Sequence, residues 1–388
     1  MMDPDAVFAT AKRRMCIRCV MDESVPGIRF DDRGICSYCH LQDRLERAFP
    51  TGPEGRRVLE RLAERMRRAG RGRAYDCVVG VSGGRDTSYC LHYVKRELGL
   101  RPLAVHFDNG WDAETAKTNL ARLCAALDVD LHTVIMDWPD SQELTNCTIR
   151  AGVPYIDVTD DIGIASSLYR TAAREGVRYI VMSHSFREEG VTPLLWNYID
   201  GRYVRALIRR YATRPLKTFR NVDLHHLLWW TFVKRIRVVN ITNYYDDTGE
   251  KVEKLLEREY GWVDTGQHHM DNELFALVYH YARHKFGFDW RVVELSAKVR
   301  CGVITRDQAL DALSRPPFFE TEEMVTYCLE KQGMSRQEYE AILRGPNRYF
   351  TDFPSWYPLL RAFRLPIRWL CRVHMLPEHA YEKFFETI

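Results

Sequence analysis

A short glycine-rich segment, Ser82 to Ser88 (SGGRDTS), carries the residues best suited to hold an anion. It follows the apolar run 77–81 and precedes a helix-compatible stretch. Two adjacent glycines let the backbone approach a ligand closely, and exposed amides at the start of a helix attract phosphate. Asp86, in the first helical turn, could hold Mg²⁺ against phosphate. We therefore expect a pyrophosphate cradle made of Ser82, Gly83, Gly84, Arg85, Asp86, Thr87 and Ser88.

Four cysteines form two Cys-x-x-Cys pairs near the start of the chain, and the residues between the pairs include few apolar side chains. Four thiolates in two pairs match a closed tetrahedral zinc site, which would supply the folding energy that this segment lacks. An iron–sulfur cluster accepts four thiolates as well. We expect structural Zn²⁺, with an iron–sulfur cluster as the alternative, on Cys16, Cys19, Cys36 and Cys39.

The residues around the glycine-rich segment alternate short apolar runs with helical patterns. Four runs are typical of buried parallel strands, and three segments between them have the apolar spacing of helices. This alternation predicts an α/β fold with a doubly wound parallel sheet, in which ligands bind at the carboxyl ends of the strands. The expected strands are 77–81, 102–107, 131–136 and 179–183, and the expected helices are 86–98, 114–127 and 161–175.

Polar residues follow the fourth expected strand, at the edge of the sheet where a ligand would bind. They are His184, Ser185 and, after a short loop, Glu189. We expect His184 and Glu189 to act together with Asp86 in catalysis, and Ser185 to contact the substrate. Capping of the next segment is the alternative role for these side chains.

The segment SGGRDTS, which directly follows an expected strand, resembles the SGGxDS loop of the N-type ATP pyrophosphatases, the PP-loop superfamily. These enzymes cleave ATP to AMP and pyrophosphate. It lacks the Gly-Lys-Ser/Thr ending of a Walker loop and the spacing of G-x-G-x-x-G. The resemblance implies ATP and Mg²⁺ as ligands. It also assigns Asp108 and Asn109, at the end of the next strand, to nucleotide contact, although Asp-Asn-Gly is also good turn chemistry.

The remaining regions are more helical. Residues 196–243 mix basic and aromatic side chains, which are either solvated on a helical insertion or form a binding surface. Further on, Thr305 and Ser335 each precede a Gln or Glu by three residues, the pattern of a helix N-terminus. We expect a zinc-binding module with the four paired cysteines at 1–50, a PP-loop domain at 51–195, the insertion at 196–250 and a helical substrate or partner region at 251–388.

Composition narrows the classes of function. Lys and Arg number 56 against 53 Asp and Glu, and a net charge of +3 is too small to indicate nucleic acid by bulk charge. The first residues have no apolar core of signal-peptide length, and the most apolar later run, 225–233, is too short to cross a bilayer. We expect a cytoplasmic protein without a membrane span, which could form a homo-oligomer.

Taken together, the motifs resemble the N-acetyl sugar amidotransferases of bacterial surface-polysaccharide (lipopolysaccharide O-antigen) pathways over most of the chain. Arg85 and Thr87 stand where lysine and serine are often found, and 266–273 is a loose match, in which His268 and Asp271 are candidates for substrate contact or helix capping. The motifs are the two cysteine pairs, the SGGxD loop, HFDNGW at 106–111, Glu189-Gly190-x-x-Pro193, YGW at 260–262 and VRCGVITRDQAL at 299–310.

The resemblance implies a reaction and two partners. An acetamido group on a nucleotide-linked or sialic-acid-like sugar becomes acetamidino, with ammonia supplied by a separate glutaminase through a cyclase-like channel subunit, both resembling those of histidine biosynthesis. An amide oxygen is a poor leaving group, so it must first attack the α-phosphorus of ATP, giving an O-adenylyl imidate and pyrophosphate. Ammonia then adds, and AMP leaves with the oxygen.

Two other functions fit the same loop. One is tRNA thiolation, which the basic aromatic residues 196–243 favour and the near-neutral net charge disfavours. The other is a zinc-stapled nucleotide-binding scaffold without turnover, which the intact double glycine and Asp86 disfavour.

Overall fold

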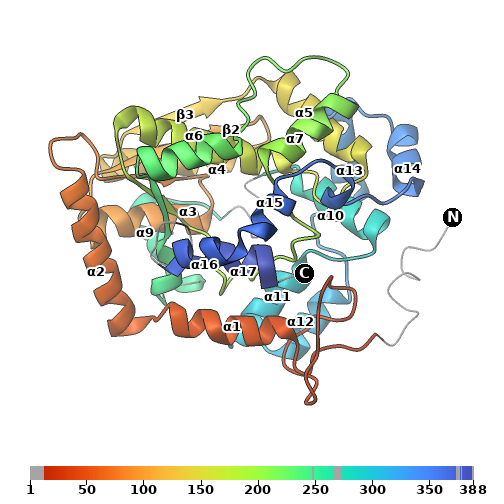
Figure 1. Cartoon of the computed structure of the whole chain (residues 1–388), viewed down its shortest axis with the longest axis horizontal. Coiled ribbons are helices and arrows are strands. Elements are labelled where there is room, and N and C mark those ends of the chain that lie inside the picture. The colour runs from red at the N-terminus through yellow and green to blue at the C-terminus, as the bar shows by residue number, and fades with distance from the viewer. Residues whose placement is uncertain (1–12, 247–248, 265–271, 373–375, 377, 387–388) are drawn as a thin grey trace.

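The computed structural model describes residues 13–246, 249–264, 272–372, 376 and 378–386. Its centre is a five-stranded sheet in which all neighbours are parallel, in the order β3-β2-β1-β4-β5 (Figure 1). The four apolar runs that the sequence indicated form strands within one residue of the expected bounds. The strands are β1 (Cys77–Gly80), β2 (Pro102–Asp108), β3 (Leu131–Ile135), β4 (Tyr179–Met182) and β5 (Arg237–Asn240).

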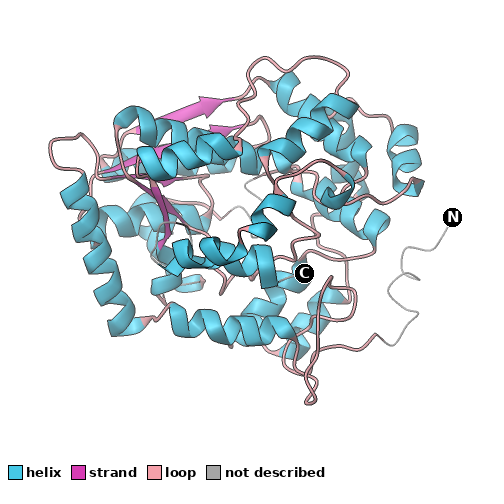
Figure 2. Ribbon diagram, in the orientation of Figure 1, coloured by secondary structure: helices cyan, strands magenta, loops and turns pink. Residues whose placement is uncertain are grey.

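Helices cover both faces of the sheet, because successive side chains of a strand point to opposite sides (Figure 2). Cys77 and Val79 of β1 join a core with α2, α3, α4 and α9, whereas Val78 packs on the other face against α6 and η3. The predicted doubly wound α/β fold is confirmed. These helices are α2 (Gly52–Ala69), α3 (Arg85–His92), α4 (Glu114–Leu127), α6 (Val158–Glu175), η3 (Trp229–Val233) and α9 (Glu250–Tyr260).

Two sequence expectations need correction. The segment expected as a helical insertion does contain α7 (Gly201–Tyr211) and α8 (Leu224–Leu228), but it also supplies β5, which pairs with β4. A four-residue strand among basic residues carries too few apolar positions to stand out. The expectation that every strand is buried is wrong for β3, because β3 forms an edge of the sheet and its Ile135 is 69% exposed.

The N-terminal module and the C-terminal part are built as expected, from a cysteine cluster followed by α1 (Ser37–Ala48) and from a series of helices. Thr305 and Gln308 form a reciprocal capping box, and the Ser335 hydroxyl accepts the Glu338 amide. No helix in the described part of the chain has both the length and the apolar character to cross a bilayer. The C-terminal helices are α10 (Phe275–Tyr281), η5 (Ala282–Phe286), α11 (Arg291–Arg300), α12 (Arg306–Leu313), α13 (Glu322–Lys331), α14 (Arg336–Arg344), η6 (Phe350–Asp352), α15 (Tyr357–Ala362), α16 (Arg364–Arg372) and α17 (Glu378–Glu386).

The other helical elements lie between the strands or directly after the last strand in the chain. The expected helix at 86–98 is α3 continued by a π-helical turn, and the helix expected at 161–175 begins three residues earlier as α6. The remaining elements are η2 (Tyr93–Glu97), α5 (Trp138–Ala151) and η4 (Ile241–Tyr244).

Candidate active site

The order of the strands defines where a ligand would bind. β1 lies between β2 and β4, so the chain moves to one side of β1 after the first crossover and to the other side later. Such a reversal opens a crevice beyond the carboxyl ends of the two central strands. The loop after β1 begins with Ser82, and the loop after β4 holds His184 and Glu189. The topology therefore brings the two predicted groups of site residues together.

The glycine-rich loop is held in a conformation that only glycine allows at its centre. Gly83 has φ +90°, and a Cβ there would lie 2.0 Å from the carbonyl oxygen of Ala116 in α4. The carbonyl of Gly83 accepts a hydrogen bond of 3.0 Å from the indole N–H of Trp262. The loop is thus fixed on both sides before any ligand arrives.

The hydroxyl groups of the loop bond to one another and to its backbone. The Ser82 and Thr87 hydroxyls are 3.1 Å apart, and the Ser82 hydroxyl accepts the Gly84 amide. The buried Ser88 hydroxyl has no hydrogen-bond partner among the described residues. Hydroxyls and a helix N-terminus in this arrangement suit an anion.

Arg85 lies within hydrogen-bonding distance of three carboxylates. It donates to Asp86 at 2.8 Å, to Glu188 at 2.6 Å and to Glu253 at 3.2 Å. Burial alone would lower the pKa of Arg85, but the charges of Asp86 and Glu188 outweigh burial and raise it. Asp86 offers the oxygen ligands that Mg²⁺ prefers, and a bound ion would share this carboxylate with Arg85.

A cavity of about 740 Å³ lies against this edge of the sheet. Ser82 and Thr87 line it from the loop, and His184 and Glu189 line it from beyond β4. The size falls within the range of small-molecule sites. Other polar residues that line it include His106, Asp112, Tyr155, Asp157, Asp160, Asp161, Asn197, Asn272 and Lys383.

His184 and Glu189 form a close pair through the imidazole Nδ1 and a carboxylate oxygen. The second oxygen of Glu189 accepts the amide of Ser185 at 3.2 Å, which orients the carboxylate. Burial would lower the pKa of His184, but Glu189 raises it above the ordinary value. Glu189 therefore makes His184 a stronger base than an ordinary histidine, at the wall of the cavity. The loop ends at Gly190, where φ is +75° and a Cβ would lie 2.8 Å from the carbonyl oxygen of Val293.

His106 and Asp112 form a second histidine–carboxylate pair on the cavity wall. The Nδ1 of His106 lies 3.0 Å from the carbonyl oxygen of Val81, which can only accept, so Nδ1 carries a proton. Its Nε2 lies 3.1 Å from Asp112. Burial raises the pKa of Asp112, and Asp112 in turn raises the pKa of His106 against the effect of burial. The geometry places one further proton between the two residues.

Three aspartates at the start of α6 line the cavity, namely Asp157, Asp160 and Asp161. The Asp157 side chain is buried, and one of its oxygens has no hydrogen-bond partner in the described residues. Burial raises the pKa values of Asp157 and Asp161. Lys383 of α17 lies near Asp161 and Glu189, and burial lowers its pKa.

The residues predicted to contact the nucleotide at the end of β2 make hydrogen bonds to nearby residues of the protein. Asp108 accepts the Gly110 amide at 2.8 Å, and Asn109 accepts the Trp111 amide while donating to Asp160 at 3.0 Å. Both lie at the same edge of the sheet as the cavity. The predicted substrate residues His268 and Asp271 lie outside the described residues.

Sequence reasoning did not select several residues of the cavity. The aspartates of α6 stand in DVTDDIG, a pattern that indicates a helix N-terminus as much as a site. His106 was part of a motif without an assigned role. Lys383 lies almost three hundred positions after Gly84 in the chain, and no sequence motif around it indicates a site.

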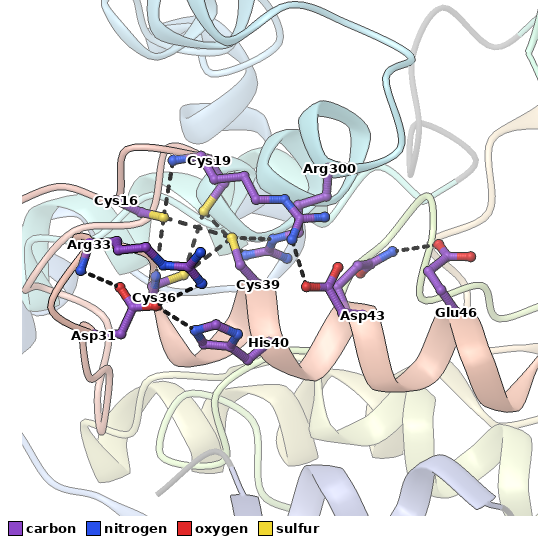
Figure 3. Close-up of polar contacts among 12 residues, drawn as sticks. Cys16, Cys19, Asp31, Arg33, Cys36, Cys39, His40, Asp43, Glu46 and Arg300 are labelled. Atoms are coloured by element: carbon purple, nitrogen blue, oxygen red, sulfur yellow. Dashed lines mark hydrogen bonds and ion pairs between the residues drawn. The ribbon is translucent and has the colours of Figure 1, made fainter.

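The four cysteines converge on one point, as Figure 3 shows. The Sγ atoms of Cys16 and Cys39 lie 3.7 Å apart, those of Cys19 and Cys36 3.7 Å, and those of Cys36 and Cys39 3.6 Å. Zinc–sulfur bonds near 2.3 Å in a tetrahedron predict sulfur–sulfur edges of about 3.8 Å. A cluster that binds each thiolate to a different iron needs wider spacing. The quartet therefore fits a single tetrahedral ion.

Two arginines connect this cluster to the C-terminal part. Arg300 donates to the sulfurs of Cys19 and Cys39, both at 3.4 Å (Figure 3). Burial would lower the pKa of Arg300, but the neighbouring cysteines raise it. Arg306 donates to the carbonyl oxygens of Cys16 and Cys19 at 3.2 Å. The cysteine module is thereby fixed against α11 and α12.

The remaining cysteines have the character of structural thiols. Burial raises the pKa values of Cys147 and Cys301, to about 12 and about 11. A thiol of raised pKa is a weak nucleophile near neutral pH. Burial raises the pKa values of Cys77, Cys90, Cys124 and Cys328 as well.

Comparison with known proteins finds a family match in the C-terminal part. Residues 243–364 match the C-terminal domain of WbpG-like LPS biosynthesis proteins. The matched segment includes Trp262, which holds the glycine-rich loop, and Arg300, which holds the cysteine cluster. The matched segment is thus in direct contact with both candidate sites.

The other likenesses are distant. An uncharacterised protein of Methanocaldococcus jannaschii is 20% identical over 291 residues, which cover 74% of this chain and 88% of that protein. Among solved structures, the NH3-dependent NAD synthetase of Campylobacter jejuni has 12% identity, covers 76% of this chain and 98% of its own, and gives a TM-score of 0.33. The U34-tRNA thiolase of Methanococcus maripaludis with its 4Fe–4S cluster has 11% identity, covers 87% and 90%, and gives a TM-score of 0.30. At these scores the two structures carry no argument about function.

Proposed function

We propose that this protein is an ATP-dependent amidotransferase that converts the acetamido group of a nucleotide-linked or sialic-acid-like sugar to an acetamidino group in lipopolysaccharide biosynthesis. The observation that carries the proposal is the cavity, which is lined both by the glycine-rich loop and by two histidine–carboxylate pairs. The match of residues 243–364 to a lipopolysaccharide biosynthesis domain supports the class of substrate.

The reaction must balance in oxygen and nitrogen. The acetamido oxygen attacks the α-phosphorus of ATP, and pyrophosphate leaves. Ammonia then forms a bond to the imidate carbon, the carbon–oxygen bond breaks, and AMP departs with the former acetamido oxygen. The products are the acetamidino sugar, AMP and pyrophosphate. Each step passes through a charged group that the protein must stabilise.

The residues of the cavity suit these charges. The amides and hydroxyls of the loop from Ser82 to Ser88 bind the phosphates, with Mg²⁺ held by Asp86 neutralising their charge when bound. His184, which is a cation when protonated, lines the cavity together with that loop, and Glu189 favours its protonation. The nitrogen of ammonia must lose a proton after it adds, and Asp157, whose raised pKa makes its carboxylate a stronger base, lies on the same wall.

The ammonia comes from outside this chain in the proposal. A separate glutaminase and a cyclase-like channel subunit would supply it, and the reaction would take place in the cytoplasm. The raised pKa values of Cys147 and Cys301 support an external source, since neither thiol is suited to attack glutamine or to carry sulfur. The Cys16, Cys19, Cys36 and Cys39 site would hold Zn²⁺ in a structural role, as the sulfur spacing suggests.

The proposal is tested with purified protein, Mg-ATP, ammonium and a panel of nucleotide-linked acetamido sugars. The sugars carry a heavy-oxygen label in the acetamido group. We expect sugar-dependent formation of AMP and pyrophosphate, transfer of the label to AMP, and a sugar product in which NH replaces oxygen. Label that stays in the sugar while AMP forms would contradict the proposed chemistry.

Matched variants separate the cavity from general effects. His184→Gln should lose at least about a hundredfold in AMP formation, because general acid–base and electrostatic groups contribute on that scale. His225→Gln changes an exposed histidine outside the cavity and should leave the rate unchanged. If unmodified tRNA and a sulfur donor trigger AMP formation while every sugar is inert, the protein is a thiolation enzyme. ATP binding without turnover for any substrate would indicate a scaffold.

A further inference from the structure

A surface on α15 and α16 exposes large apolar side chains to solvent. Leu359 and Phe363 are 40% and 54% exposed, and Leu365 and Trp369 are 73% and 60% exposed. Leu365 and Trp369 are four positions apart in α16, so they lie on one side of that helix, whereas Leu359 lies in α15 and Phe363 directly follows α15. We define the α15–α16 patch as these four residues together with Arg361, Arg364 and Arg368.

The charge of this patch has one sign. From Phe353 to Pro377 the sequence contains no aspartate or glutamate, whereas it contains four arginines. Arg361, Arg364 and Arg368 are exposed; Arg361 lies in α15, and Arg364 and Arg368 are four residues apart in α16, which places these two on one side of that helix. Arg364 also donates to the hydroxyl of Tyr381 at 2.7 Å, which joins α16 to α17.

We propose that the α15–α16 patch attaches this protein to an anionic lipid surface. Helices that lie in a membrane interface combine Trp, Phe and Leu on one side with Arg or Lys beside them, and they bind through buried apolar area and attraction to anionic lipids. Long arginine stems let the charged ends reach headgroups while the apolar side chains enter the acyl region.

A second copy of the chain fits this patch less well. A two-fold contact would bring the same surface of each copy together, and residues 353–377, which include four arginines and no Asp or Glu, would face the same residues of the other copy. The centre of a protein–protein interface is normally depleted of charge. Charge complementarity therefore favours a lipid surface over a second copy.

The patch is continuous with the helices that border the cavity. Leu360 of α15 lines the cavity and is the neighbour of the exposed Leu359, and Lys383 and Phe384 of α17 line it as well. α15, α16 and α17 lie together at the front of the molecule in Figure 1, and α16 packs against α17. Binding at the patch would hold these elements at the membrane surface. The inference does not depend on the proposed reaction, because it rests only on exposure and charge.

The test is sedimentation of the full chain with vesicles of phosphatidylcholine alone or of phosphatidylcholine mixed with phosphatidylglycerol. We expect binding to the mixed vesicles that is at least about tenfold stronger than to phosphatidylcholine and that weakens as salt is raised, because the attraction is partly electrostatic. Absence of binding to the mixed vesicles would overturn the proposal.

A pair of double variants identifies the surface. Leu365→Glu with Trp369→Glu should lower binding by at least about tenfold, since both apolar side chains and the charge balance are lost. The matched control is Ile135→Glu with Phe318→Glu, which makes the same change at side chains 69% and 59% exposed elsewhere. Equal loss in both variants would overturn the assignment to this patch. Size-exclusion chromatography gives a second readout: a dimer that the first variant dissociates would show that a second copy, and not lipid, covers the patch.

Discussion

Replacing Gly83 with alanine should impair the glycine-rich loop, because the new side chain would collide with the backbone of α4. The new Cβ would lie 2.0 Å from the carbonyl oxygen of Ala116, whereas an ordinary contact begins at 3.4 Å, so the two atoms must separate by a further 1.4 Å. The Trp262 indole holds the Gly83 carbonyl at 3.0 Å and opposes this movement. A displacement of about 1 Å at a reacting site costs about a hundredfold in rate.

Part of the cost of this substitution comes from the backbone angle alone. At φ +90° an L-residue pays about 1–2 kcal/mol, whatever its surroundings. Gly302 provides the matched control, because its φ is +72° and no atom lies within 4 Å of a Cβ built there. The Gly302→Ala variant should therefore lose a similar amount of stability from the angle and keep full ATP binding.

The measurements are thermal unfolding and ATP titration by calorimetry, followed by AMP formation with the sugar substrate. We expect Gly83→Ala to bind ATP at least about tenfold more weakly and to form AMP about a hundredfold more slowly, while remaining folded. The reasoning is wrong if Gly83→Ala unfolds at the same temperature as Gly302→Ala and binds ATP as tightly as the unmodified protein. That result would mean that the loop does not hold the phosphates.

Three further predictions test the other features. The purified protein should contain one zinc per chain, and Cys36→Ser should lose the metal and unfold at lower temperature; metal analysis showing several irons per chain instead would contradict the single-ion geometry. Because Glu189 raises the pKa of His184, the pair stabilises the fold fully below about pH 6.5, the ordinary histidine pKa, and the stabilisation disappears as pH rises through the raised value. Glu189→Gln should thus destabilise the protein more at acid than at alkaline pH in denaturant titrations, and a pH-independent difference would exclude this coupling. Arg300→Met should weaken zinc retention against a chelator because it removes two hydrogen bonds to cysteine sulfur, whereas the exposed Arg61→Met should not.

Much of the sheet could be predicted because its strands are local patterns. The runs that became β1, β2 and β4 are dense in Val, Ile and Leu, and the glycine-rich loop stands directly between β1 and α3. The four-residue β5 could not be found this way. Its residues are partly exposed at the edge of the sheet and stand among arginines, so nothing in the local pattern separates it from the helices before it.

The candidate site, like the sheet, could be predicted from the sequence only in part. By itself, the spacing of the cysteines and of the residues from Ser82 to Ser88 predicted a metal site and a phosphate site, because the expected ligand atoms come from neighbours in the chain. The tertiary structure alone decided that β1 and β4 would be adjacent, and hence that His184 would face the loop. It also decided that Asp157 and Lys383 would enter one cavity, because the crossovers and the C-terminal helices bring distant residues together there. Local spacing can specify a loop or a metal site, but a cavity depends on contacts between residues that are far apart in the sequence.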